Sequence, residues 1–90
     1  MGSRPGYEFY MTVKVLLFAS YADSLGARSM HFDMPQGATV ADVLGRVRAL
    51  PGADRLPSEP LMAVNERYAR GTRVLEAGDE VAIIPPVAGG

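Results

Sequence analysis

The chain has 90 residues, which is enough for one small domain with one hydrophobic core, so a multidomain enzyme with a cleft between two lobes is excluded. Hydrophobic residues make up 48% of the chain and charged residues 21%, as in a folded globule and unlike a disordered or collagen-like chain. Nine basic and ten acidic side chains give a net charge of −1 without a cluster of Lys or Arg, so we expect no nucleic-acid partner.

Cysteine is absent and His31 is the single histidine. These counts exclude a disulfide framework, a thiolate-rich zinc site and an internal thiol nucleophile, and we expect no metal site. No apolar run approaches the roughly 20 residues that a membrane span requires, and no charged leader precedes a secretory-type apolar core. We therefore expect a soluble, cytoplasmic protein without a membrane partner.

Residues 1–10 combine a Gly-Ser opening with Arg4-Pro5-Gly6 and stand directly before a second methionine, Met11. We interpret them as an expression leader or disordered terminus. The folded domain is expected to span residues 11–84, followed by a flexible tail at residues 85–90.

Two strands are predicted before the main helix. Residues 12–19 are rich in Val, Leu and Phe, and the face that carries Lys14 is expected to look away from the helix because lysine is rarely buried completely. Residues 21–26 form a connector with room for a helical turn. Residues 28–34 alternate strictly between apolar and polar side chains, which predicts a half-buried strand with His31 on its solvated face.

The helix is predicted from Thr39 as N-cap, with Asp42 in the capping-box position, to the Pro51-Gly52 pair. Its apolar residues recur at helical spacing: Val40, Val43, Leu44, Val47 and Leu50. Gly45 within this helix costs about 1 kcal/mol relative to alanine, and close packing against a strand is the expected reason for it.

Three further strands are expected after a proline-rich loop: 61–64, a brief pairing at 68–69, and 80–84, with a turn at Asn65-Glu66 between the first two. The element order predicts an α+β fold of the β-grasp (ubiquitin-like) type. In this fold a mixed four- to five-stranded sheet is covered on one face by a single main helix.

The chain ends in Pro85-Pro86-Val87-Ala88-Gly89-Gly90. Two prolines hold the exit from the sheet extended, and the last residues carry almost no side-chain bulk. Six residues at about 3.3 Å each reach on the order of 20 Å, far enough to carry a terminal carboxylate into the active site of another protein.

With this tail and the Gly78-Asp79-Glu80 turn before the last strand, residues 12–90 resemble the ubiquitin-like sulfur carriers, and among them the small subunits of molybdopterin synthase. The resemblance implies that an adenylyltransferase related to ubiquitin-activating enzymes uses ATP to adenylate Gly90. A persulfide donor then converts the adenylate into a thiocarboxylate, and the chain itself binds no cofactor and is not catalytic alone. It implies docking on the large synthase subunit, in a heterotetramer, and sulfur donation to cyclic pyranopterin monophosphate for molybdenum cofactor biosynthesis.

In that family Pro85, Pro86, Val87, Ala88 and Gly89 would thread the partner's site, and Phe18, Tyr68 and Ile84 match positions that contact the large subunit. Placement of Phe18 and Ile84 in the core is the competing interpretation, because strand faces are hard to assign from sequence. Alternatives for the whole chain are a carrier for thiamine or another thiolated product, a protein modifier joined to lysines, and a ubiquitin-like binding module without catalysis.

Other residues have local explanations. We expect these carboxylates in strand-surface, cap and turn roles rather than as an acid/base pair: Asp33, Asp42, Asp79 and Glu80. The glycines fit turns and match neither a P-loop nor a dinucleotide fingerprint, and Arg67, Arg70 and Arg73 are expected on a solvated face.

Overall fold

A computed structural model describes residues 9–86. In this part of the chain the elements are the following: β1 (Tyr10–Leu17), α1 (Ala19–Leu25), β2 (Ser29–Pro35), α2 (Val40–Arg48), the short 3₁₀ helix η2 (Ala53–Arg55), β3 (Leu61–Val64), β4 (Arg67–Tyr68) and β5 (Glu80–Ile84). None of the helices in residues 9–86 is both long enough and apolar enough to cross a membrane.

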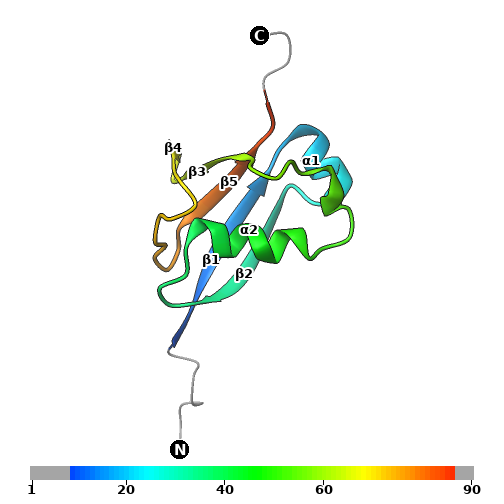
Figure 1. Ribbon diagram of the computed structural model, residues 1–90. Helices are drawn as coiled ribbons and strands as arrows, with labels where there is room; N and C mark the ends of the chain where they lie inside the picture. The colour runs from blue at the N-terminus through cyan, green and yellow to red at the C-terminus, as the bar shows by residue number, and fades with distance from the viewer. Residues whose placement is uncertain (1–8, 87–90) are drawn as a thin grey trace, which may run out of the picture.

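Within residues 9–86 the strands form one five-stranded mixed sheet in the order β2-β1-β5-β3-β4. The central strands β1 and β5 are parallel, and the remaining neighbours are antiparallel. Helix α2 crosses one face of the sheet, and α1 lies at the end of the sheet where β1 and β5 finish (Figure 1). The predicted β-grasp arrangement is confirmed.

The core lies between α2 and the sheet. Alternate residues of the two central strands are completely buried against the helix, as the period of two requires: Val13, Val15, Val81 and Ile83. The helix contributes Val40, Val43 and Val47 at helical spacing, each fully buried. Edge strand β2 adds Met34, with Met30 and Phe32 packed at the margin of this cluster.

Helix α2 begins with the predicted capping box. The Thr39 N–H donates to Asp42 Oδ2 at 2.9 Å, and the Asp42 N–H donates to Thr39 Oγ1 at 3.3 Å. Near the other end, the Arg46 guanidinium lies 5.0 Å from the centre of the Phe32 ring and donates to the Asp33 carbonyl at 3.2 Å. Both ends of the helix are therefore attached by polar contacts as well as by the buried valines.

The prediction for Gly45 is wrong. A Cβ at this position would meet no atom within 4 Å, and the residue lies on the exposed side of α2. The helical spacing itself explains the error, because Gly45 stands between the buried positions 43 and 47 on the opposite side of the turn.

Element boundaries also differ from those predicted. Strand β1 begins at Tyr10, which pairs with Pro35, so the last residue of the expected leader takes part in the sheet. The strand ends at Leu17, and the expected connector holds a seven-residue helix, α1, closed by Gly26 in a left-handed conformation (φ 78°). Helix α2 ends at Arg48 rather than beside Pro51, and β4 starts one residue earlier than predicted.

Candidate functional site

The sheet face opposite α2 carries a shallow hollow of about 380 Å³, which we call the open-face hollow. It is lined by Leu16, Phe18, Ala63, Glu66, Tyr68, Glu80, Ala82 and Ile84. All three residues predicted to contact a partner therefore lie on one surface: Phe18, Tyr68 and Ile84.

Strand register explains why the hollow forms. Leu16 of β1 pairs with Ala82 of β5, Ala82 with Ala63 of β3, and Ala63 with Tyr68 of β4, so one row of side chains crosses four strands. The two middle members of this row are alanines, whereas the side chains around them are large. A depression with a small-residue floor and an apolar wall results.

The structure places Phe18 and Tyr68 outside the core. Phe18 is 46% exposed and Tyr68 is 73% exposed, although both are large and apolar enough to be buried. Ile84 is half-buried on the open face, whereas its neighbour Ile83 is completely buried beneath α2. Exposed aromatic side chains around a depression are typical of surfaces that bind other proteins. The interface role of these residues stays a prediction.

One end of the open face is polar. The Lys14 ammonium, whose side chain is 41% exposed, lies 3.9 Å from a carboxylate oxygen of Glu80. His31 pairs with Lys14 in the neighbouring strand and is exposed, as predicted. Glu66 approaches the hollow from the turn between β3 and β4. The open face thus divides into an apolar half near the end of β5 and a charged half near its start.

The predicted tail begins at the apolar half. Ile84, the last residue of β5, lines the open-face hollow, and Pro85 and Pro86 follow it, half-buried and exposed respectively. Because β5 is parallel to β1, it finishes at the end of the sheet where β1 also finishes (Figure 1). The remaining predicted tail residues, Val87, Ala88, Gly89 and Gly90, lie outside the described residues.

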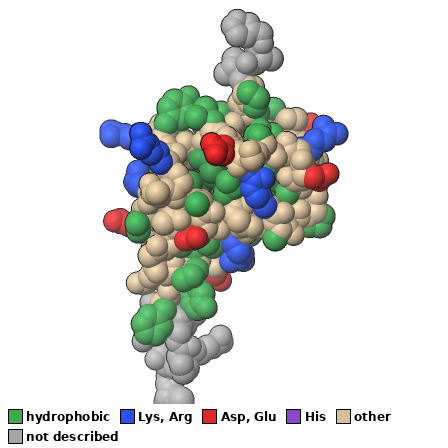
Figure 2. Space-filling view, viewed as in Figure 1, with side chains coloured by type: hydrophobic (Ala, Val, Ile, Leu, Met, Phe, Trp, Pro, Cys, Tyr) green, Lys and Arg blue, Asp and Glu red, His purple; other side chains and the backbone are tan. Residues whose placement is uncertain are grey.

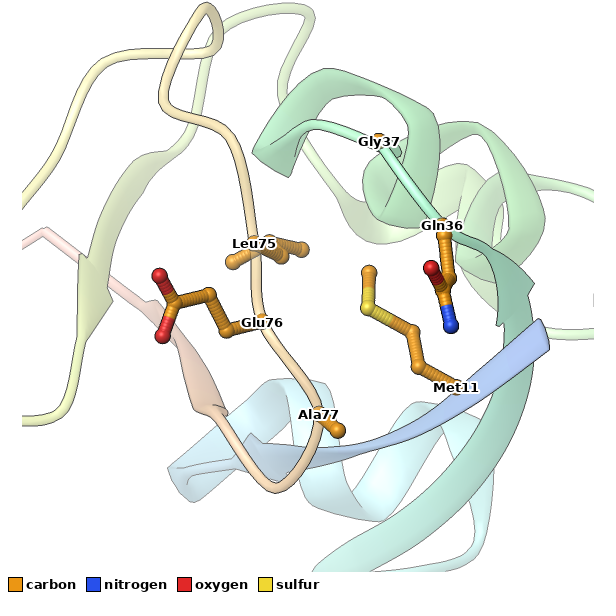
Figure 3. Close-up of a pocket in the computed structure, with 6 residues that line it drawn as sticks. All are labelled: Met11, Gln36, Gly37, Leu75, Glu76 and Ala77. Carbon is orange, nitrogen blue, oxygen red and sulfur yellow. The ribbon is translucent and has the colours of Figure 1, made fainter. Parts of the chain in front are cut away.

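Two other depressions gather none of the predicted site residues. One of about 290 Å³ lies beside the start of β1, where Met11 and Leu75 point into it and the Glu76 carboxylate points away (Figure 3). The other, of about 540 Å³, lies between α2 and the loops that flank β3 and β4, with Glu59 and Arg70 among its lining residues. On the α2 side of the molecule, basic and acidic side chains are interspersed, so neither sign dominates that face (Figure 2).

The carboxylates singled out in the sequence take the local roles predicted for them. Asp33 accepts a hydrogen bond from the Thr12 hydroxyl at 2.9 Å, Asp42 caps α2, and Asp79 accepts from the Glu76 N–H at 2.8 Å. Glu80 pairs with Lys14. Among the described residues, no group of three or more His, Asp or Glu side chains is placed to hold a metal ion.

Sequence reasoning missed two features of the hollow. The first is its floor of Ala63 and Ala82, which alanine content alone does not reveal because it depends on strand register. The second is Glu66, for which the sequence predicts only a turn position. The sequence does contain a signal for Glu66. The second position of a two-residue hairpin turn usually holds glycine, so a glutamate there is unusual.

Comparison with known proteins decides the family. Residues 15–90 match the model of the ThiS family. The chain belongs to the ThiS family. It is 37% identical over 83 residues to the molybdopterin synthase sulfur carrier subunit of Chlamydomonas reinhardtii, an alignment that covers 89% of this chain and 100% of the relative.

Solved structures related to this ThiS family member have the same fold. The crystal structure of SAMP1 from Haloferax volcanii matches with a TM-score of 0.77 and 31% identity, covering 88% of this chain and 99% of that one. A chain from the complex of subunits 1 and 2 of the molybdopterin-converting factor of Helicobacter pylori matches with a TM-score of 0.66. That match has 18% identity and covers 89% of this chain and 100% of the other, so it supports the fold alone.

Proposed function

We propose that this protein is the sulfur carrier and small subunit of a molybdopterin synthase. The observation that carries the proposal is the continuity of the site: the strand that lines the open-face hollow leads directly into Pro85-Pro86-Val87-Ala88-Gly89-Gly90. A carrier needs a surface by which its partner holds it and a thin arm that enters the partner's active site, and here one strand joins the two. The similarity to sulfur carrier subunits supports the same conclusion.

The proposed chemistry takes place at the Gly90 carboxylate. A free carboxylate is a poor electrophile, so a ubiquitin-activating-like adenylyltransferase joins it to the AMP part of ATP and releases pyrophosphate. The terminal sulfur of a persulfide donor attacks the acyl carbon and displaces AMP, and a thiol then breaks the sulfur–sulfur bond. The thiocarboxylate that remains donates its sulfur to cyclic pyranopterin monophosphate, and two rounds supply the dithiolene of molybdopterin.

Every step of this chemistry is performed on the chain by other proteins, so the chain is the sulfur-donating subunit of a sulfurtransferase. ATP is bound by the activating partner, and the carrier binds no cofactor. The absence of cysteine fits this role, because no internal thiol competes for the sulfur by exchange.

The proposed docking partner is the large subunit of molybdopterin synthase, in a heterotetramer. The open-face hollow, with its exposed Phe18 and Tyr68, is the proposed contact surface. Support comes from the Chlamydomonas reinhardtii relative, which is named as the sulfur carrier subunit of a molybdopterin synthase. Pro85 to Gly89 would lie in the channel that leads to the large subunit's active site.

A second candidate function is protein modification, which the similarity to SAMP1, a small archaeal modifier protein, favours. A modifier also needs an adenylated terminal glycine, but the acyl group then passes to a lysine amine of another protein. The two functions therefore share their first step and differ in the acceptor.

Intact mass spectrometry tests the proposal. The full chain is incubated with ATP, the adenylyltransferase and a persulfide donor from the same organism. We expect the mass gain of one oxygen replaced by sulfur, and no gain for a variant that lacks Gly90. Circular dichroism of that variant controls for folding, which should be unchanged because a free terminus contributes little packing.

Two outcomes contradict the proposal. An unchanged mass, with an adenylyltransferase that thiolates a known carrier, would favour a ubiquitin-like binding module. A thiocarboxylate that the large subunit cannot use, but that a thiazole-forming or other thiolating enzyme consumes, would favour another product such as thiamine.

A further inference from the structure

Glu66 occupies an unusual position at the open-face hollow. It is the second residue of the two-residue turn between β3 and β4, because Val64 pairs with Arg67 on either side of Asn65-Glu66. Glu66 and Tyr68 both line the hollow. Glu66 is exposed, and within residues 9–86 its carboxylate has no hydrogen bond or ion pair.

The backbone at Glu66 is strained for its residue type. Asn65 has φ 50° and Glu66 has φ 73°, the left-handed conformation that this kind of hairpin turn requires at both central positions. Asparagine tolerates this conformation, and glycine adopts it freely, whereas glutamate is disfavoured there by its Cβ. A strained side chain at a surface turn points to a function for that side chain rather than for the turn.

The other carboxylates of the same face have partners. Glu80 pairs with Lys14, and Asp33 accepts from the Thr12 hydroxyl. Arg67, which follows Glu66 in the chain, belongs to the opposite face of β4, since its cross-strand partner Val64 points into the core. Glu66 therefore keeps an unpaired negative charge beside an apolar surface.

This charge constrains what can cover the hollow. A protein that packs on Leu16, Phe18 and Ala82 removes water from the neighbouring carboxylate. Desolvation of an unpaired carboxylate opposes binding unless the partner supplies a cation within ion-pair distance. Partners with an apolar or acidic group at that point are thereby rejected.

We propose that Glu66 is a specificity-determining residue of the open face, which accepts an ion pair from an Arg or Lys side chain of the docked protein. The inference rests on the proposed function, because the docked protein is taken to be the large subunit of molybdopterin synthase. It adds the chemistry of one contact: the large subunit presents a basic side chain opposite the β3–β4 turn.

Charge variants test the contact. The affinity of the large subunit is measured for the full-length wild-type chain, for Glu66→Gln and for Glu66→Arg, at low and at physiological salt. At low salt we expect about threefold weaker binding for Glu66→Gln and more than about tenfold weaker binding for Glu66→Arg. Both differences from wild type should be smaller at physiological salt. Glu59→Arg is the matched control. It makes the same charge change at an exposed glutamate that lines the depression beside α2, and it should bind within about twofold of wild type.

A glycine variant separates this role from a structural one. Glu66→Gly relieves the turn, so we expect its midpoint of thermal unfolding to rise by about 4 °C while its affinity for the large subunit falls about threefold. A purely structural residue would not show stability and binding that change in opposite directions.

The outcomes distinguish the two proposals. If the wild type binds the large subunit and Glu66→Arg binds equally tightly, the inference on Glu66 is overturned and the carrier function stands. If the wild type does not bind the large subunit at all, both are overturned. If sedimentation shows a wild-type dimer that Glu66→Arg disrupts, the face serves self-association and the assigned partner is wrong.

Discussion

At the scale of single residues, two separate physical reasons restrict position 52 to glycine. Its φ is 91°, in the left-handed region, and a Cβ there would lie 2.1 Å from the Ser24 carbonyl oxygen. Gly52 precedes η2, and Ser24 belongs to α1, so this close approach joins the segment after α2 to the helix at the end of the sheet. The atoms that this Cβ would meet belong to the backbone of Ser24 and Leu25, so they cannot move aside as a flexible side chain could.

Gly52→Ala should therefore destabilise the domain by about 3 kcal/mol, since the strain of the left-handed conformation adds to the clash. Urea denaturation measures the free energy of unfolding. Gly26→Ala is the control, because Gly26 also has a positive φ of 78° but a Cβ there would meet nothing within 4 Å. It should cost about 1 kcal/mol, and equal losses for the two variants would contradict the role of the Ser24 contact.

Asn65 joins two turns at the charged end of the open face: the turn between β3 and β4, to which it belongs, and the turn that precedes β5. Its side-chain amide donates to Asp79 Oδ1 at 3.0 Å, and its side-chain oxygen accepts from the Glu80 N–H at 3.0 Å. Its backbone N–H donates to the Glu80 carbonyl at 2.8 Å. The hairpin of β3 and β4 is thereby held to the start of β5, which positions Glu66 and Tyr68 at the hollow.

Asn65→Ala should lower the free energy of unfolding by about 2 kcal/mol, because it removes two side-chain hydrogen bonds and places a less tolerant residue at φ 50°. Chemical denaturation again measures the change. Thr12→Val is the comparison, since it removes a single exposed hydrogen bond, to Asp33, and should cost less than about 1 kcal/mol. A loss no larger for Asn65→Ala than for Thr12→Val would show that the bridge between the turns does not stabilise the fold.

At the scale of elements, α2 contains a position where a substitution should stabilise the domain. Gly45 lies on its exposed side with open space where a Cβ would be. Gly45→Ala should raise the free energy of unfolding by about 1 kcal/mol, because alanine loses less backbone entropy in a helix and nothing is crowded. Thermal and urea denaturation measure the gain, and destabilisation would show that a neighbour requires the glycine after all.

The elements that could be predicted from the sequence are those with a strong period or a specific signal. The alternation in 28–34 and the capping box at Thr39 and Asp42 gave β2 and the start of α2 within about one residue. For α1 the sequence predicts only a connector with room for a helical turn, because the seven residues of this helix carry no capping side chain and bury one side chain, Tyr21. A short helix of this kind is stabilised by tertiary packing, which a local pattern does not contain.

At the scale of the whole molecule, the site is a product of register. Phe18, Tyr68 and Ile84 were predicted from a family resemblance, and their convergence depends on β1 and β5 running parallel with Leu16 opposite Ala82. That pairing joins segments far apart in the chain, so no local pattern reveals it. The role of Glu66 was hidden for the same reason, because its turn becomes the border of a hollow only once the sheet is assembled.

The open face offers a direct test of docking against folding. Phe18→Ala should weaken binding of the large subunit by about tenfold or more while changing the free energy of unfolding by less than about 1 kcal/mol, since the ring is 46% exposed and stands at the hollow. Isothermal titration calorimetry measures the affinity, and urea denaturation measures the stability.

Tyr10→Ala is the matched control, because Tyr10 is also aromatic and is 52% exposed. It stands at the start of β1, away from the hollow, whereas Phe18 directly follows the end of this strand. Its affinity should stay within about twofold of wild type. If Phe18→Ala instead loses stability and affinity in equal measure, the ring supports the fold rather than the contact. If both variants bind like wild type, the partner contacts another face. The open-face hollow would then not be the docking surface, although β5 still leads from it to the diglycine.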